Sequence, residues 1–365
     1  MRTVTHLICI CASVLLLTVS CSPKVDSDGI RIIDADLTGK EITDISLTDL
    51  DKTVLEFSEE SIIGGIKDLV CTDDGGYIIA SGTAGNYRLM QFDRDGRYIR
   101  DISHQGRGPG EYLNITSIFM LGDTLNVGSF QGFNHSLQRY IITPGGYTVI
   151  PGTESGDIKH GIIYMTATPD IPGRYIVKHI WNGTPGFSTP LYGIYDRDWN
   201  VVDTSKVKYP AGGYSTSFPF SHVDRSIYMA FIGSDTIYRA DGERITPAII
   251  YDFGQSGLPA DIKYNFANRF EYNRSHPDDS THLFHNCSLI SEDKVYACMS
   301  TASSVLIMVH DLRSGKSKFY RILGEDGEPA GLYYMFNAPD GRSYGIFMPS
   351  GKSEQNPAVY DISLL

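Results

Sequence analysis

The sequence predicts an all-β protein, a six-bladed β-propeller made of four-stranded antiparallel sheets. The first observation behind this prediction is a pattern of four short alternating strands that returns along the chain. The second is a surplus of strands at the N-terminus that matches a shortage at the C-terminus. Composition agrees, because Tyr (23) and Gly (37) are abundant and Trp (2) is scarce, a mixture that suits strands and tight turns.

The first complete set of strands lies between Ile66 and Ile102. Its four apolar segments alternate with turns rich in Asp and Gly, as expected for an antiparallel meander. A glycine-dense corner follows, Gly106-Arg-Gly-Pro-Gly-Glu-Tyr112. Glycine permits a positive φ and proline fixes its own φ, so we expect a stiff joint rather than a slack linker.

The same pattern returns four more times, at intervals of about 54 residues, which fits propeller blades with long loops. The later sets span residues 115–150, 162–207, 220–253 and 287–323. The last section, 333–362, offers only three strands, whereas residues 30–57 hold strands without a sheet of their own. We expect the strand near Thr53–Phe57 to complete the sixth sheet, because a closed ring leaves no unpaired edge.

The N-terminus predicts export. Residues 1–21 combine a basic start at Arg2, an apolar run and the ending Leu17-Thr-Val-Ser-Cys21, which resembles a bacterial lipobox. We expect acylation of Cys21, a polar tether over residues 22–29 and a propeller over residues 30–365. An ordinary signal peptide with an incidental cysteine is the alternative. The anchor implies the bacterial cell envelope, at the outer membrane, with its periplasmic or surface face left open.

Two cysteines flank a predicted hairpin whose turn centres on Glu292-Asp293. This register places Cys287 opposite Cys298, and an oxidising compartment would permit a disulfide between them. Two small apolar residues packed side by side explain the pattern equally well. Both interpretations therefore stay open at this point.

The segment Ala260–Asn286 interrupts the repeat with aromatic residues at roughly helical spacing. We expect a short helix and a long loop on one face, and loops longer than about 12 residues are often functional. His285 and Asn286, at its end, are candidate ligand contacts. The spacing of His276, His282 and His285 matches no standard metal site, so we expect no metal there.

The corner has two interpretations. Arg107, Glu111 and Tyr112 are candidate ligand contacts at the mouth of the propeller, with directional hydrogen bonds from the charged groups and a flat ring from tyrosine. Alternatively, Glu111 accepts amide hydrogen bonds and fixes the joint while Tyr112 packs under the next blade. The structural interpretation is favoured, since weaker copies of the corner stand at Gly152, Gly254 and Gly324.

Catalytic and cofactor motifs are absent from the sequence. It has neither a Gly-x-x-x-x-Gly-Lys-Ser/Thr phosphate loop nor a Gly-x-Ser-x-Gly nucleophile elbow, and its Asp/Gly turns do not continue into a calcium loop. We therefore expect no catalytic residue and no cofactor. A net charge of -12 repels phosphate backbones, which argues against a nucleic-acid partner.

The stretch Asp93–Tyr112 resembles the hallmark of the six-bladed β-propeller lipoproteins common in Bacteroidetes, often labelled TolB-like. It carries an Asp-x-x-Gly turn, a strand and then Gly-x-Gly-Pro-Gly-Glu. The resemblance implies a lipid anchor and closure of the ring by an N-terminal strand. That family has largely no assigned activity, so the resemblance transfers no catalytic residue.

The sequence thus predicts a monomeric, envelope-anchored lipoprotein that serves as a non-catalytic binding or scaffold module. The class of its partner, whether protein, peptide or glycan, is left open. The rival hypothesis is an envelope hydrolase or lyase that acts on a sugar or peptide in the propeller channel.

Overall fold

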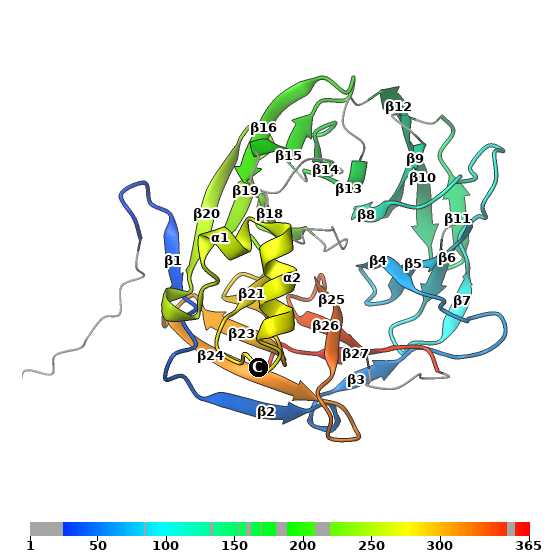
Figure 1. Ribbon diagram of the computed structural model, residues 1–365. Coiled ribbons are helices and arrows are strands. Elements are labelled where there is room, and N and C mark those ends of the chain that lie inside the picture. The colour runs from blue at the N-terminus through cyan, green and yellow to red at the C-terminus, as the bar shows by residue number, and fades with distance from the viewer. Residues whose placement is uncertain are drawn as a thin grey trace, which may run out of the picture.

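The strands of the protein form six sheets arranged in a ring, as Figure 1 shows in a view down the central axis. The computed structural model describes residues 25–83, 85–131, 134–152, 154–157, 162–168, 170–179, 188–208, 220–348 and 355–365. The six-bladed β-propeller that the sequence predicts is therefore confirmed. Among the residues in these ranges, no helix is both long enough and apolar enough to cross a membrane.

Blades one to three are antiparallel meanders in chain order, with the first strand of each nearest the axis. Blade one contains β4 (Ile66–Cys71), β5 (Tyr77–Thr83), β6 (Asn86–Phe92) and β7 (Tyr98–Asp101). Blade two contains β8 (Ser117–Leu121), β9 (Thr124–Gln131), β10 (Asn134–Thr143) and β11 (Gly146–Val149), with β12 (Glu154–Asp157) also paired to β10. Blade three contains β13 (Ile162–Ala167), β14 (Tyr175–His179), β15 (Ser188–Tyr195) and β16 (Val201–Lys208).

Blades four to six repeat the meander and then borrow strands from the N-terminus. Blade four contains β17 (Ser221–Val223), β18 (Ser226–Ala230), β19 (Thr236–Ala240) and β20 (Ile245–Asp252). Blade five contains β21 (Phe284–Ile290), β22 (Lys294–Ser300), β23 (Val305–Asp311) and β24 (Lys316–Leu323). Blade six contains β25 (Gly331–Asn337), β26 (Ser343–Met348) and β27 (Ala358–Asp361).

The ring closes where β3 (Lys52–Val54) completes blade six. It pairs antiparallel with β27, with Thr53 opposite Val359. This pairing covers the open edge of β27 with a strand from the other end of the chain. Closure by an N-terminal strand is thus confirmed, at the segment that the sequence singled out.

The sequence indicates strands in residues 30–57 but not the sheets that two of them join. β1 (Arg31–Asp34) pairs parallel with β20, and β2 (Ile42–Ser46) pairs parallel with β24. Blades four and five are therefore five-stranded mixed sheets, and blade two has a fifth, antiparallel strand in β12, so the prediction of four-stranded antiparallel sheets is wrong for these three blades. The chain has to pass blades four and five on its way to blade six, and the outer edges of β20 and β24 offer free backbone groups along that path.

We call residues 31–54 the belt, because they run along the outside of blades four, five and six (Figure 1). A short 3₁₀-helix, Leu47–Asp49, joins its second and third strands. The side chain of Ser46 caps this helix by accepting a hydrogen bond from the backbone N–H of Thr48 at 3.2 Å. The belt thus covers the outer edges of three consecutive blades before it closes the ring.

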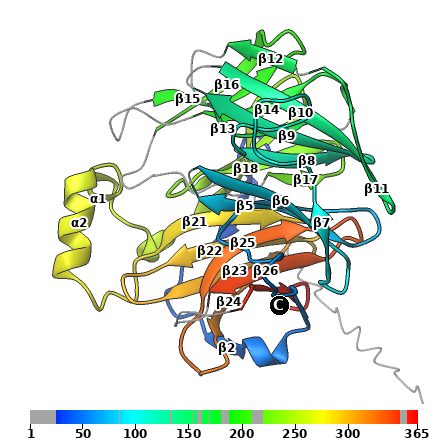
Figure 2. The same cartoon turned by 90° about the vertical axis from the view of Figure 1, so that its right-hand side faces the viewer.

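The insertion between blades four and five forms helices α1 (Ala260–Lys263) and α2 (Phe266–Ser275). Figure 2 shows both helices standing off one face of the disc, which we call the helical face. The predicted helix is present, but β21 already begins at Phe284. His285 and Asn286 consequently belong to a strand of blade five and not to the loop in which the sequence placed them.

Candidate functional site

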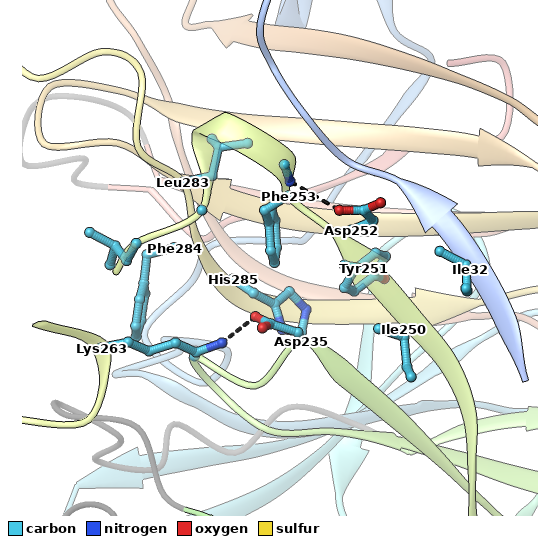
Figure 3. Close-up of a pocket in the computed structure, with 14 residues that line it drawn as sticks. Ile32, Asp235, Ile250, Tyr251, Asp252, Phe253, Lys263, Leu283, Phe284 and His285 are labelled. Atoms are coloured by element: carbon cyan, nitrogen blue, oxygen red, sulfur yellow. Dashed lines mark hydrogen bonds and ion pairs between the residues drawn. The ribbon is translucent and has the colours of Figure 1, made fainter. Parts of the chain in front are cut away.

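A cavity of about 390 Å³ lies where blade four, blade five, the belt and the insertion meet. Figure 3 shows the side chains that line it. Its charged and polar side chains include Asp235, Asp252, Lys263 and His285, and much of its apolar wall comes from Phe253 and Phe284. Ligand sites in proteins commonly combine an apolar wall with a few polar groups in this way.

An ion pair between Lys263 and Asp235 provides the charged part of the cavity. The ammonium of Lys263 donates a hydrogen bond to Asp235 Oδ1, as the dashed line in Figure 3 marks. The lysine side chain is only 9% exposed, whereas the aspartate side chain is 41% exposed. A nearly buried ammonium needs such a partner, because removing a charge from water is unfavourable unless an opposite charge compensates it.

Local structure explains how Lys263 reaches the cavity. Pro259 precedes α1, and the backbone N–H of Lys263 donates to the carbonyl of Pro259 at 2.8 Å. Proline is well suited to the start of a helix because its φ is already fixed. This single turn directs Lys263 at the loop between β18 and β19, which carries Asp235.

The floor of the cavity contains a chain of buried hydrogen bonds. His285 Nδ1 lies 2.7 Å from the carbonyl oxygen of Ser234, and its Nε2 lies 2.7 Å from Ser288 Oγ. Because a carbonyl only accepts, Nδ1 carries the proton, and Ser288 therefore donates to Nε2. Ser288 in turn accepts from the phenol of Tyr251 at 2.7 Å. Burial lowers the pKa of His285 to about 4, so the imidazole is neutral at pH 7.

A bulge in β21 makes this chain of hydrogen bonds possible. The register between β21 and β22 shifts between His285 and Cys287. In a regular strand, residues three apart point to opposite faces of the sheet, whereas one extra residue brings His285 and Ser288 to the same side. The bulge therefore aims the histidine at the cavity.

The belt holds one rim of the cavity. Ile32 of β1 lies opposite Ile250 of β20, and both line the cavity. Asp36 accepts a hydrogen bond from Ser256 Oγ at 2.8 Å and one from the backbone N–H of Gln255 at 3.2 Å. The backbone of Thr38 and these groups hold the pKa of Asp36 well below its usual range. The loop at the rim is thus fastened to the N-terminal strands.

The corner Gly106–Tyr112 lies at the junction of blades one and two, on the far side of the ring from the insertion (Figure 1). The carboxylate of Glu111 accepts from the backbone N–H of Gly108 at 2.6 Å and lies 2.7 Å from His104 Nε2. The hydrogen bond from Gly108 lowers the pKa of Glu111. Tyr112 is 1% exposed and packs in the core between the two blades, while Arg107 is exposed.

The other candidate residues are distributed over separate places. His285 lines the cavity, whereas Asn286 donates to Cys298 Sγ at 3.8 Å, in the interior of blade five. His282 lies 2.8 Å from the carboxylate of Asp279 within the insertion, apart from His285. In the described ranges, no three His, Cys, Asp or Glu side chains are arranged to hold a metal ion. Cys21 lies outside the described residues.

The predicted register of the cysteine hairpin is confirmed, since Cys287 and Cys298 are direct cross-strand partners. Both are buried and carry free thiols in this structure. Burial raises the pKa of the Cys287 thiol well above its ordinary value. The pair is therefore placed for a disulfide, whose formation stays a prediction.

A second cavity, of about 400 Å³, lies between blades six and one and is lined by turns rich in aspartate. Arg342 neutralises part of the negative charge of the cavity's carboxylates. It pairs with Asp340 at 2.7 Å and with Asp361 at 3.4 Å. Its rim consists of the tight turns that connect strands, where Asp accepts local amide hydrogen bonds. The cavity beside the insertion is the stronger candidate, because the nearly buried charge of Lys263 lines it.

Sequence reasoning missed Asp235 and Lys263. Neither residue stands in a motif, and Asp235 occupies an ordinary turn between two strands. The signal that pointed in their direction was the long insertion itself, which contains Lys263 and ends beside His285. The partnership between the two residues exists only after the insertion has folded back over blade four.

Solved structures are similar to this chain at low sequence identity. A protein from Bacteroides fragilis, whose description calls it exported, is 15% identical over 90% of this chain and 98% of its own, with a TM-score of 0.64. A member of the DUF4221 family from Bacteroides vulgatus is 12% identical over 85% of this chain and 96% of its own, with a TM-score of 0.51. The PQQ-bound aldose sugar dehydrogenase of Streptomyces coelicolor is 10% identical over 85% of this chain and 97% of its own, with a TM-score of 0.48.

No curated protein matches the sequence. A family model does, over residues 36–360, and its description is a domain of unknown function, DUF4934. The matched region runs from the belt to the last strand of blade six and so includes every blade. The chain therefore belongs to the DUF4934 family, whose domain here is a six-bladed β-propeller.

Proposed function

We propose that the protein is an exported, lipid-anchored binding module whose ligand occupies the cavity between blade four, blade five and the insertion. The observation that carries this proposal is the Lys263–Asp235 ion pair, which is nearly buried on the lysine side and faces a cavity with aromatic walls. The sequence holds no recognised catalytic motif, which favours binding over turnover.

Export and anchoring rest on the N-terminal sequence. The apolar run that ends at Cys21 has the arrangement of a lipoprotein signal. The structural relative from Bacteroides fragilis, described as exported, is compatible with this location. One acyl chain gives only weak membrane binding, so a stable anchor requires two or more chains on the cysteine.

The anchor is tested by expressing the full chain and Cys21→Ser in a bacterial host that processes lipoproteins. We expect the parent protein to incorporate a fatty-acid label and to sediment with the membranes, and the variant to do neither. A parent protein that carries no label contradicts the anchor. The result leaves the cavity assignment untouched, because the two depend on different parts of the chain.

The cavity is tested by a thermal-shift screen of peptides, sugars and small metabolites against the purified protein. Leu258, half-buried on the cavity lining, is replaced by Trp to fill the space. Leu121, exposed at the end of β8, receives the same change as a matched control. We expect stabilising ligands to lose their effect in Leu258→Trp and to keep it in Leu121→Trp. Ligands that stabilise both variants equally would place the binding site elsewhere.

A further inference from the structure

We propose that the ligand of this cavity is a neutral, polyhydroxylated molecule of the sugar class, held through two adjacent hydroxyl groups by Asp235 and Lys263. This inference rests on the proposed binding function and specifies its ligand. It is argued from the hydrogen-bonding capacity of the ion pair, the charge balance of the cavity and the character of its walls.

The ion pair has unused hydrogen-bonding capacity on both sides. An ammonium group has three N–H donors, and within the described residues Lys263 Nζ makes one hydrogen bond, to Asp235 Oδ1. The other carboxylate oxygen of Asp235 accepts none from that part of the chain. The ion pair therefore presents a donor and an acceptor side by side to the cavity.

Adjacent hydroxyls on a sugar ring match this arrangement. One hydroxyl oxygen accepts from Lys263 Nζ, while its neighbour donates to the free carboxylate oxygen of Asp235. The two oxygens of such a diol are separated by about the length of a hydrogen bond, roughly 2.8 Å. A hydroxyl both donates and accepts, so a diol satisfies both partners, whereas a lone carbonyl or amine satisfies only one.

The charge of the cavity disfavours an ionised ligand. The charges of Lys263 and Asp235 cancel, and His285 is neutral because its buried Nε2 accepts from Ser288. Asp252, exposed at the rim, adds a negative charge that repels anions. A cation would have to approach the ammonium of Lys263. A neutral ligand is repelled neither by Asp252, as an anion would be, nor by Lys263, as a cation would be.

The walls fit the apolar face of a sugar ring. Phe253 and Phe284 line the cavity, and Tyr251 lies 5.9 Å from Phe253, ring centre to ring centre. Phe253 and Phe284 are almost fully buried, so each offers the cavity only part of its ring, as a small rigid apolar contact for the C–H face of a pyranose. Figure 3 shows the Lys263–Asp235 ion pair in the same cavity as Phe284 and His285.

The test is saturation-transfer NMR with a panel of neutral methyl hexopyranosides, run beside the matching uronic acids and short neutral peptides. Asp235→Asn and Lys263→Met each remove one charge at nearly constant volume. Asp123→Asn and Lys316→Met make the same changes at exposed positions, on a turn of blade two and at the start of β24 in blade five. Thermal unfolding of each variant establishes that it is folded at the temperature of the binding measurement.

We expect at least one neutral hexopyranoside to receive saturation at its ring C–H protons. This signal should be lost in Asp235→Asn and Lys263→Met and retained in the two matched controls. Absence of transfer to every neutral sugar would overturn the inference, as would transfer that survives both cavity variants. Peptides or uronic acids that bind instead, and are lost in Leu258→Trp, would overturn the sugar class while leaving the cavity as the binding site.

Discussion

Asp68 Oδ1 accepts a hydrogen bond from the phenol of Tyr164 at 3.0 Å, which joins the inner strands of blades one and three. The same carboxylate accepts from the phenol of Tyr334 in blade six and from the backbone N–H of Ile118 in blade two, the latter at 2.6 Å. Asp68 is fully buried. One carboxylate thus binds the inner strands of four blades together at the centre of the ring.

Loss of one phenol should destabilise this centre. In Tyr164→Phe the buried carboxylate loses a donor, and hydrogen bonds to charged groups contribute about 1.5–3 kcal/mol each. Above pH 7, where the carboxylate is charged, we expect the free energy of unfolding in urea to fall by roughly that amount. Tyr147→Phe, at a tyrosine that is 38% exposed on blade two, is the matched control and should change stability little. Equal effects of the two variants would mean that the Asp68 centre does not contribute.

The stability of the protein should also depend on pH through Asp68. Burial raises the pKa of Asp68 to about 7, although its hydrogen bonds to Tyr334, Ile118 and Tyr164 oppose the rise. In the unfolded chain the group titrates near its ordinary value of about 3.9. Between these two values the folded state binds the proton and the unfolded state does not, so this group's contribution to stability falls as pH rises from about 4 to 7.

Comparison with Asp68→Asn isolates this contribution, because the variant cannot titrate at this position. The difference in unfolding free energy between parent and variant should decline across that pH range and level off above it. A difference that stays constant with pH would show that Asp68 keeps an ordinary pKa despite its burial.

The fold could be predicted because the strands and turns of each blade follow from short local sequence patterns. Alternating apolar residues fix which face of a strand is buried, and Asp/Gly turns fix where it ends, so Tyr77–Thr83 and Asn86–Phe92 are recognisable from neighbours alone. The parallel pairing of β1 and β2 could not be predicted in the same way. Their partners, β20 and β24, lie more than two hundred residues away, and a short amphipathic strand does not specify which open edge it joins.

The candidate site was harder to predict for a related reason. His285 was singled out through its place at the end of the insertion, but its position on a strand depends on a bulge that leaves no clear mark in the sequence. Asp235 and Lys263 are ordinary residues of a turn and a short helix. Their ion pair forms by a contact between two loops that are separate in the sequence, and local sequence patterns do not predict such a contact.

Cys287 and Cys298 should form a disulfide when the protein is exported to an oxidising compartment. They are direct cross-strand partners, and in the chain-entropy model a bridge that closes a loop of this length stabilises the fold by about 3 kcal/mol. Alkylation under denaturing conditions, before and after reduction, should block these two thiols only after reduction. Cys71, which has no cysteine opposite it in blade one, should react in both cases and serves as the internal control. Full alkylation without reductant would contradict the prediction.

The corner between blades one and two should tolerate no side chain at Gly110. Its φ of 76° lies in the left-handed region, and an added Cβ would stand 2.6 Å from Val149 Cγ1. A left-handed backbone alone costs about 1–2 kcal/mol for a residue with a side chain, and the clash adds to this. We expect Gly110→Ala to lower the free energy of unfolding by at least that amount. Gly145→Ala, on a turn of blade two with no neighbour within 4 Å, should have little effect.

Ring closure should depend on β3 more than on β2. Thr53→Pro removes a backbone donor from the strand that pairs with β27, and a buried partner left without its hydrogen bond costs about 1–3 kcal/mol. Thr43→Pro makes the same change in β2, which adds a fifth strand to a blade that already has four.

Because only β3 joins the two ends of the chain, we expect Thr53→Pro to open blade six and increase amide hydrogen exchange in β25, β26 and β27. Thr43→Pro should increase exchange in β2 and β24 alone. Equal exchange in blade six for both variants would show that the belt acts as one unit and that the closing strand has no special part in holding the ring.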